Sequence, residues 1–172
     1  MNTPETYNFL SSLNYQLTIT RITNLEYFSQ KVMWPEVSVN PVLVPTPFQD
    51  MRVTGDHMTV SPVTIEFKVD EDMNNYFDLL EWMAEASFPN DYGQYKTAID
   101  NKNLYSDGSI IVYNNTKNVT RIVDFSQMFP IKLSAPVFDT TAASVQYVTC
   151  NATFYFQTMK VRKPGDISTV IV

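Results

Sequence analysis

Apolar and polar residues alternate along several stretches of this chain, which places the apolar side chains on one face of a half-buried strand. The two clearest such strands span residues 63–69, "VTIEFKV", and residues 148–156, "VTCNATFYF". A third alternating segment covers residues 15–20, and residues 27–34 follow it after a short connection around Asn24. These two segments predict a hairpin. The pattern therefore predicts a mainly β fold.

Further strands are predicted in the second half of the chain. Residues 109–113 and 119–125 flank "NNTKN", whose asparagines tolerate the left-handed backbone of tight turns, so this stretch predicts another hairpin. Residues 129–133 predict one more strand, and Pro130 favours an edge position for it because proline has no N–H to donate.

Residues 73–84 break the alternation and predict a single amphipathic helix that covers one sheet. Asp70 or Asp72 is suited to cap its N-terminus, Glu71 suits the positive end of its dipole, and "FPN" at residues 88–90 ends it. The apolar face predicted from the i, i+3, i+4, i+7 spacing consists of Met73, Tyr76, Phe77, Leu80, Met83 and Ala84.

Two tracts fit neither pattern. Residues 35–49 contain four prolines, and residues 91–107 are polar with interspersed tyrosines. Both are interpreted as long connections, which in a compact domain are disproportionately functional.

Length and charge narrow the class of protein. A chain of 172 residues that is 44% hydrophobic can enclose one ordinary core, so we expect a single domain over residues 1–172. Twelve Lys and Arg against eighteen Asp and Glu give a net charge of −6, and no basic run is present, so tight binding to nucleic acid is not expected. The first residues do not read as a signal peptide, and no window is apolar enough for a membrane span.

The sequence contains few candidates for catalytic or metal-binding residues. His57 is the one histidine, and Gly55-Asp56 before it predicts a turn that leads into a strand. The cluster at residues 70–72 lacks the spaced ligands of a calcium loop, and Cys150 falls on the apolar face of its strand. We expect no catalytic residue, no cofactor and no metal site, although an enzyme whose site is assembled from scattered residues stays open.

The order of several local patterns resembles the tail tube protein family of contractile-tailed phages, as in the T4-like group. The stretches that resemble the family are "FQDMRVTGD" at residues 48–56, "VTIEFKV", "MNNYFDLLEWM" at 73–83, "SIIVYNNTKNVTRIVDF" at 109–125, Phe129-Pro130, and "VTCNATFYFQTMKV" at 148–161. The chain departs from the family in its Pro-rich connection and in a C-terminal tail over residues 161–172.

The resemblance implies a phage tail-tube β-sandwich or barrel with one flanking helix. Six copies would close a ring, and rings would stack into a virion tail tube through which DNA and the tape-measure protein pass. Further implied partners are the tail sheath and the baseplate, with assembly in the host cytoplasm and no membrane. Open alternatives are a baseplate, tube-initiating or tube-terminating protein, a bacterial secretion-tube protein of the same fold, and a monomeric ligand-binding β-barrel.

One segment is predicted as an inter-subunit contact. An aromatic, a methionine and charged residues follow one another in a long connection, where a folded monomer has little reason to expose them. These residues are Phe48, Gln49, Asp50, Met51 and Arg52.

Overall fold

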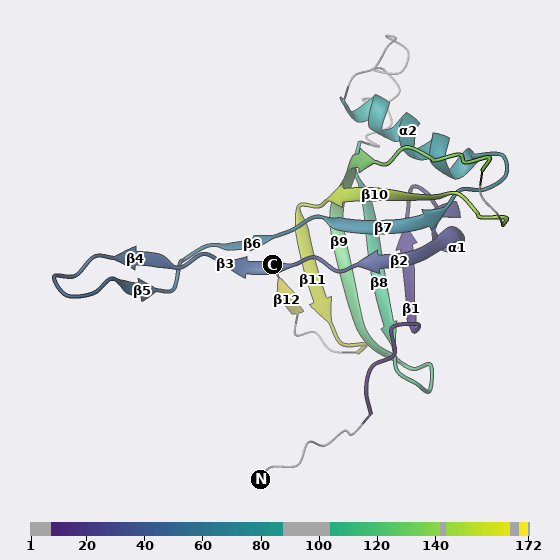
Figure 1. The fold of residues 1–172 in the computed structure, drawn as a ribbon. Helices are drawn as coiled ribbons and strands as arrows, with labels where there is room; N and C mark the ends of the chain where they lie inside the picture. The colour runs from purple at the N-terminus through teal and green to yellow at the C-terminus, as the bar shows by residue number, and fades with distance from the viewer. Residues whose placement is uncertain (1–7, 88–103, 142–143, 166–168, 172) are drawn as a thin grey trace.

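The computed structural model describes residues 8–87, 104–141, 144–165 and 169–171. Strands dominate the described part of the chain (Figure 1). In chain order the elements are β1 (Tyr15–Ile19), α1 (Asn24–Phe28), β2 (Ser29–Met33), β3 (Val37–Val39), β4 (Val42–Val44), β5 (Met51–Val53), β6 (Met58–Val60), β7 (Val63–Lys68), α2 (Asn74–Ser87), β8 (Ser106–Tyr113), β9 (Val119–Leu133), β10 (Thr149–Tyr155), β11 (Thr158–Arg162) and β12 (Thr169–Ile171).

Two antiparallel sheets form the body, and both include the long strand β9. In sheet A the order is β1-β8-β9-β11-β12, where β8 and β11 flank the first half of β9. In sheet B the order is β2-β7-β10-β9, where β10 pairs with the second half of β9. The strands of sheet B cross those of sheet A at a steep angle (Figure 1). The body is therefore a β-sandwich whose two layers are joined by one continuous strand.

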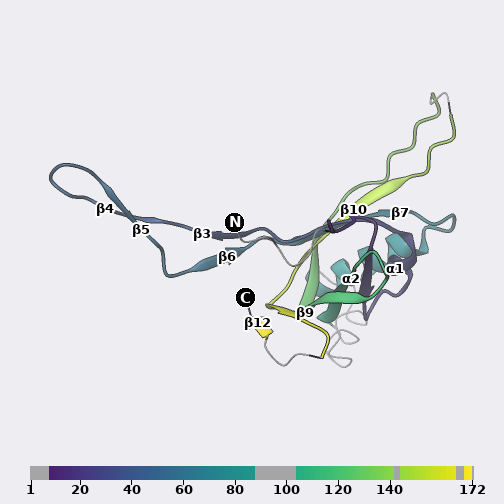
Figure 2. The ribbon, with the colours of Figure 1, turned by 90° about the horizontal axis from the view of Figure 1, so that it is seen from below.

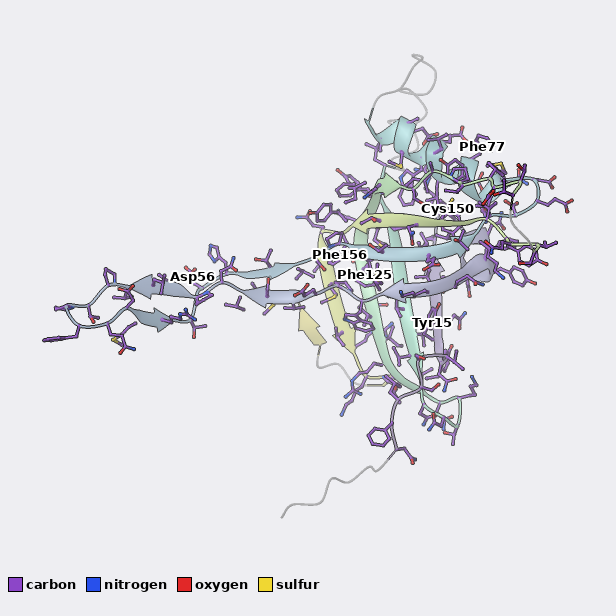
Figure 3. All side chains as sticks on the ribbon, in the orientation of Figure 1. Tyr15, Asp56, Phe77, Phe125, Cys150 and Phe156 are labelled. Carbon is purple, nitrogen blue, oxygen red and sulfur yellow. The ribbon has the colours of Figure 1, made fainter. Side chains whose placement is uncertain are left out.

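The predicted alternation decides which side chains fill the space between the sheets. Val63, Ile65 and Phe67 of β7 are buried, and the register places them opposite buried residues of β10. From sheet A, Phe125 is buried, and its ring lies 4.8 Å from that of Phe156 (Figure 3). The strand predictions for residues 63–69 and 148–156 are therefore confirmed. The remaining buried apolar side chains are Leu17, Ile19, Ile22, Leu25, Leu79, Trp82, Ile110, Val123, Met128, Cys150, Ala152, Phe154 and Met159.

The sequence predicted a helix that covers one sheet; α2 is present, but it covers one end of the sandwich and does so with a different face. Trp82 is fully buried, donates its indole N–H to the Leu104 carbonyl at 3.0 Å, and lies 6.0 Å from the Phe154 ring. Phe77 and Leu80, which belong to the predicted face, are about half exposed. Apolar residues occur on two sides of this helix, and the side that includes Trp82 is buried because it hides the largest apolar surface. Among the described residues, no helix is both long and apolar enough to cross a membrane.

The start of α2 is fixed by reciprocal hydrogen bonds between Asp70 and Asn75. The Asp70 carboxylate accepts from the Asn75 backbone N–H at 3.2 Å, and the Asn75 side chain accepts from the Asp70 N–H at 3.3 Å. Asn75 is fully buried and also donates to the Lys68 carbonyl at 2.8 Å. Of the two predicted caps, Asp70 therefore makes the contact, and it ties the helix to the end of β7. The predicted helix end at residues 88–90 lies outside the described residues.

Two strand predictions need correction. Residues 27–34 do not form one strand that pairs with 15–20, because α1 occupies residues 24–28, β1 pairs with β8 and β2 pairs with β7. Residues 129–133 are not a separate strand but the second half of β9. Both errors concern pairings between residues far apart in the chain, which local periodicity does not reveal. The edge position predicted from Pro130 is correct, since β9 ends the order of sheet B.

The C-terminal residues also form strands. β11 runs to Arg162, which donates to the Asp124 carboxylate at 2.6 Å, and β12 pairs with β11. Asp124 also raises the pKa of Arg162. The segment from residue 161, predicted as a tail, therefore contributes to sheet A.

Candidate assembly interface

A two-stranded arm, residues 36–61, projects far from the body (Figures 1 and 2). Near the body β3 pairs with β6, and further out β4 pairs with β5. At its base the Ser61 N–H donates to the Glu36 carbonyl at 2.9 Å, and the Glu36 N–H donates to the Ser61 hydroxyl at 2.7 Å. Residues 35–49, interpreted from the sequence as a long connection, therefore contain the strands β3 and β4. The prolines, which suggested a loop, lie just outside the short strands, where no ladder hydrogen bond is required.

The two ladders of the arm meet at a joint where the backbones approach closely. A Cβ atom at Gly55 would lie 2.0 Å from the Asn40 carbonyl oxygen, so only glycine fits there without a shift of the backbone. His57 and Asp56 lie at the same joint, with 3.4 Å between the His57 Nδ1 and the Asp56 carboxylate (Figure 3). Both side chains are about nine-tenths exposed. His57 therefore lies in the short connection between β5 and β6, at the position where the sequence predicted a turn that leads into a strand.

The five residues predicted as a contact lie together at the far end of the arm. Phe48, Gln49 and Asp50 belong to the turn between β4 and β5, while Met51 and Arg52 begin β5. Within the turn the Thr46 hydroxyl donates to the Gln49 carbonyl, and the Gln49 N–H donates back to that hydroxyl at 3.2 Å. All five predicted residues are exposed, and the Phe48 side chain is fully so. That they contact another subunit stays a prediction.

The rest of the arm is apolar on its surface as well. Its strands are built from β-branched and other apolar residues that have no core to cover within the described chain. The apolar side chains that are more than four-tenths exposed are Val37, Val39, Val42, Leu43, Val44, Phe48, Met51, Val53 and Met58.

A second apolar extension connects β9 to β10, and the sequence analysis did not identify it. Val137, Phe138, Val145 and Tyr147 are each at least seven-tenths exposed on this connection, which leaves the body in Figure 2 as a long green and yellow excursion. The apolar pair "VF" between Pro136 and Asp139 is the sequence feature that could have indicated this extension. Hydrogen bonds from the Thr141 N–H and hydroxyl to the Asp139 carboxylate lower the pKa of Asp139.

The sheets end in strands that lack a second neighbour among the described residues. Sheet A ends in β1 and β12, and sheet B ends in β2 and the second half of β9. β1 reads "YQLTI" and contains no charge or proline, the residues that usually protect an edge from pairing with another chain. On β2, the Ser29 hydroxyl is buried and has no hydrogen-bond partner among the described residues.

The residues weighed for chemistry are not brought together. His57 lies on the arm, Asp70 caps α2, and Cys150 is buried between the sheets, where burial raises the pKa of its thiol. Over residues 8–87, 104–141, 144–165 and 169–171, no three His, Cys, Asp or Glu side chains are grouped as a metal site.

A comparison with protein-family models finds no match for the sequence, and no curated protein matches it. Solved structures do share its fold. A chain in the tube-terminating cap of the anti-feeding prophage aligns with a TM-score of 0.64 and 12% identity over 94% of this chain and 96% of that one. A chain in the extended sheath-tube complex of PVC, an extracellular contractile injection system, aligns with a TM-score of 0.62 and 13% identity over 94% of this chain and 99% of that one. Hcp1 from E. coli aligns with a TM-score of 0.50 and 6% identity over 92% of this chain and 97% of that one. The chain therefore has the tail-tube-like β fold.

Proposed function

We propose that this chain is a structural subunit of the tube in a contractile tail. Copies join edge to edge into rings of six, the rings stack, and the resulting tube conducts DNA during ejection from a phage of the T4-like type. The whole chain acts as one domain, and its role is assembly rather than catalysis. Its further partners are the sheath, the baseplate and the tape-measure protein, and the tube is assembled in the host cytoplasm before it resides in the particle.

The arm is the observation in this chain that supports the proposal most strongly. An isolated two-stranded hairpin is at best marginally stable in water, and this one exposes nine apolar side chains with no third strand or helix among the described residues to support it. An exposed apolar surface of this kind marks a site of interaction with another protein. The arm is therefore suited to lie against neighbouring copies in an assembled tube.

The open sheet edges support ring formation. Two different edges of one subunit make a heterologous contact, and such contacts generate a closed ring when the rotation between copies closes. β2 and the second half of β9 each contain a lysine, and β12 is only three residues long. The uncharged, five-residue edge of β1 is therefore the proposed site of pairing with a neighbour. Ring closure would then remove an edge that invites uncontrolled aggregation in a free monomer.

Two alternatives follow from other observations. The likeness to a chain of the tube-terminating cap is as close as the likeness to a chain of the sheath-tube complex, so a cap or baseplate role is the second candidate. A protein of that kind should stop at single rings, whereas a main subunit should grow into rods. A monomeric ligand-binding barrel is disfavoured because Trp82, Phe67 and Phe154 fill the space between the sheets where a ligand would lie.

The proposal predicts that charge reversal at the arm tip blocks assembly. Met51→Asp with Arg52→Glu places three like charges beside one another with Asp50, and such charges are costly to bury in an interface. We expect sedimentation of rods to be lost while far-UV circular dichroism stays native, because these side chains do not pack on the body. Lys163→Glu, an exposed charge reversal away from the arm, is the matched control. Rods that form normally from the double variant would contradict the role given to the arm.

A further inference from the structure

Three aromatic rings form an exposed cluster where β9 meets β10. The rings of Tyr105 and Phe129 lie 5.8 Å apart in an edge-to-face arrangement, and Phe129 lies 6.2 Å from Tyr155. Tyr105 is 54% exposed and Tyr155 is 45% exposed. Aromatic residues left half exposed in mutual contact are typical of protein interfaces, where rigid rings supply contact area at low entropic cost.

An apolar cleft of about 320 Å³ opens beside this cluster, between α2 and β9. It is lined by Met83 and Ala86 of α2, by Leu104 and Tyr105, and by residues 129–131 of β9. Among the described residues of this lining, the Tyr105 hydroxyl is the sole polar side-chain group. Three other surface hollows in the described part of the chain differ, because polar or charged side chains such as Glu26, Asp124 and Asn115 contribute to them.

The volume of the cleft suits a single aromatic side chain. It lies at the lower limit of the range for small-molecule pockets, about 300 to 1,000 Å³, and the described side chains that line it are apolar apart from the Tyr105 hydroxyl. The cleft also borders the second half of β9, which is a free edge of sheet B among the described residues. A neighbouring copy that approaches this edge would therefore cover the cleft as well.

The arm tip offers the matching group. Phe48 is fully exposed, and a Phe side chain removes roughly 150 to 250 Å² from water when it is buried. The arm extends away from the body on the side remote from α2, to the left in Figure 1 (Figures 1 and 2). At about 3.3 Å per residue, residues 37–44 alone extend over about 25 Å. Phe48 therefore cannot enter the cleft of its own chain, but it can enter that of another copy.

We propose that Phe48 of one copy inserts into the cleft between α2 and β9 of a second copy and packs against Tyr105 and Phe129. This inference rests on the proposed function, since it names the receiving surface for the arm in the assembled tube. The contact joins two different surfaces of the chain, so it is heterologous and repeats from copy to copy.

Disulfide cross-linking tests the contact directly. The native Cys150 is buried, so cysteines introduced at Gln49, beside Phe48, and at Ala86, in the cleft, are the accessible thiols. Q49C protein is mixed with A86C protein, assembled, and oxidised with diamide. We expect a covalent dimer on a non-reducing gel. The matched control replaces A86C with L13C, an exposed position that lines a different hollow, and should give no dimer.

Removal of the ring tests its contribution. Phe48→Ala should raise the protein concentration needed for assembly at least about 30-fold, as expected for an aromatic residue at the centre of a contact. Phe9→Ala, also exposed but distant from the arm in sequence, should leave this concentration unchanged. Rods from Phe48→Ala at the wild-type concentration, or a Q49C dimer with L13C and none with A86C, would overturn the contact while the proposed function stands. A wild-type protein that stays monomeric would overturn both.

Discussion

At the scale of single residues, the joint of the arm depends on Gly55. The distance of 2.0 Å between a Cβ atom at this position and the Asn40 carbonyl oxygen is far below any contact that real side chains make. Glycine is therefore required at position 55, because the backbones of the two strands come too close there for a Cβ atom. The arm keeps its shape only if the two backbones stay this close.

Gly55→Ala is expected to distort the arm without unfolding the body. The added methyl group must push the two ladders apart, whereas the core residues lie elsewhere, so the free energy of unfolding should change by less than about 1 kcal/mol. Assembly should weaken about tenfold or more, measured as the concentration at which rods sediment. His57→Asn, two residues away and about nine-tenths exposed, is the control and should assemble normally, since Asn also accepts turn geometry. Equal assembly of Gly55→Ala and the wild type would show that the joint is not needed.

At the scale of elements, α2 is held on the sandwich chiefly through Trp82. Besides its burial and its hydrogen bond to Leu104, its ring faces the Arg21 guanidinium at 5.0 Å, and Arg21 pairs with Glu85 at 2.5 Å. The segment that follows β1 and the helix are therefore joined through the Trp82 ring and through the Arg21–Glu85 ion pair.

Trp82→Ala should destabilise the protein by about 3 to 5 kcal/mol, because it removes a large buried ring and leaves the Leu104 carbonyl without its donor. Phe77→Ala, at a half-exposed position of the same helix, should cost less than about 1 kcal/mol. Urea unfolding, monitored by circular dichroism rather than by tryptophan fluorescence, measures the free energy of unfolding of both variants. A larger loss for Phe77→Ala than for Trp82→Ala would contradict the face assigned to the helix.

The elements that could be predicted from the sequence are those whose signal is local. β7 and β10 follow from alternation alone, and the hairpin of β8 and β9 follows from alternation with an asparagine-rich turn. The pairing of β1 with β8 was missed because these strands are some ninety residues apart and nothing near residue 20 specifies the partner. The arm was missed because its strands are three residues long and separated by prolines. The residues predicted as a contact at its tip, including Phe48 and Met51, are exposed in the structure, and their contact with another subunit stays a prediction.

At the scale of the whole molecule, the charge of the chain bears on its proposed role as a conduit for DNA. A ring of subunits that each have a net charge of −6 presents passing DNA with like charge overall. Within the described residues, aromatic and cationic groups do approach each other, as in Lys68 with Tyr147 at 4.9 Å, but no basic run accompanies them in the sequence. A tube of this composition should let nucleic acid pass without retaining it.

Assembled protein is therefore expected to show no measurable retention of double- or single-stranded DNA near physiological salt. A filter-binding or co-sedimentation assay measures this, with titration from low to high salt. Micromolar binding that weakens steeply as salt is added would reveal phosphate contacts and would indicate a DNA-handling role at one end of the tail.

The central claim is that this tail-tube-like fold assembles with itself, and electron microscopy of the purified protein over a range of concentrations tests it most directly. The account predicts six-fold rings about 80 to 100 Å wide, an expectation taken from the resemblance to tube proteins, that stack into rods as the concentration rises. A particle that stays at 19.7 kDa at every concentration, without rings or rods, would contradict it.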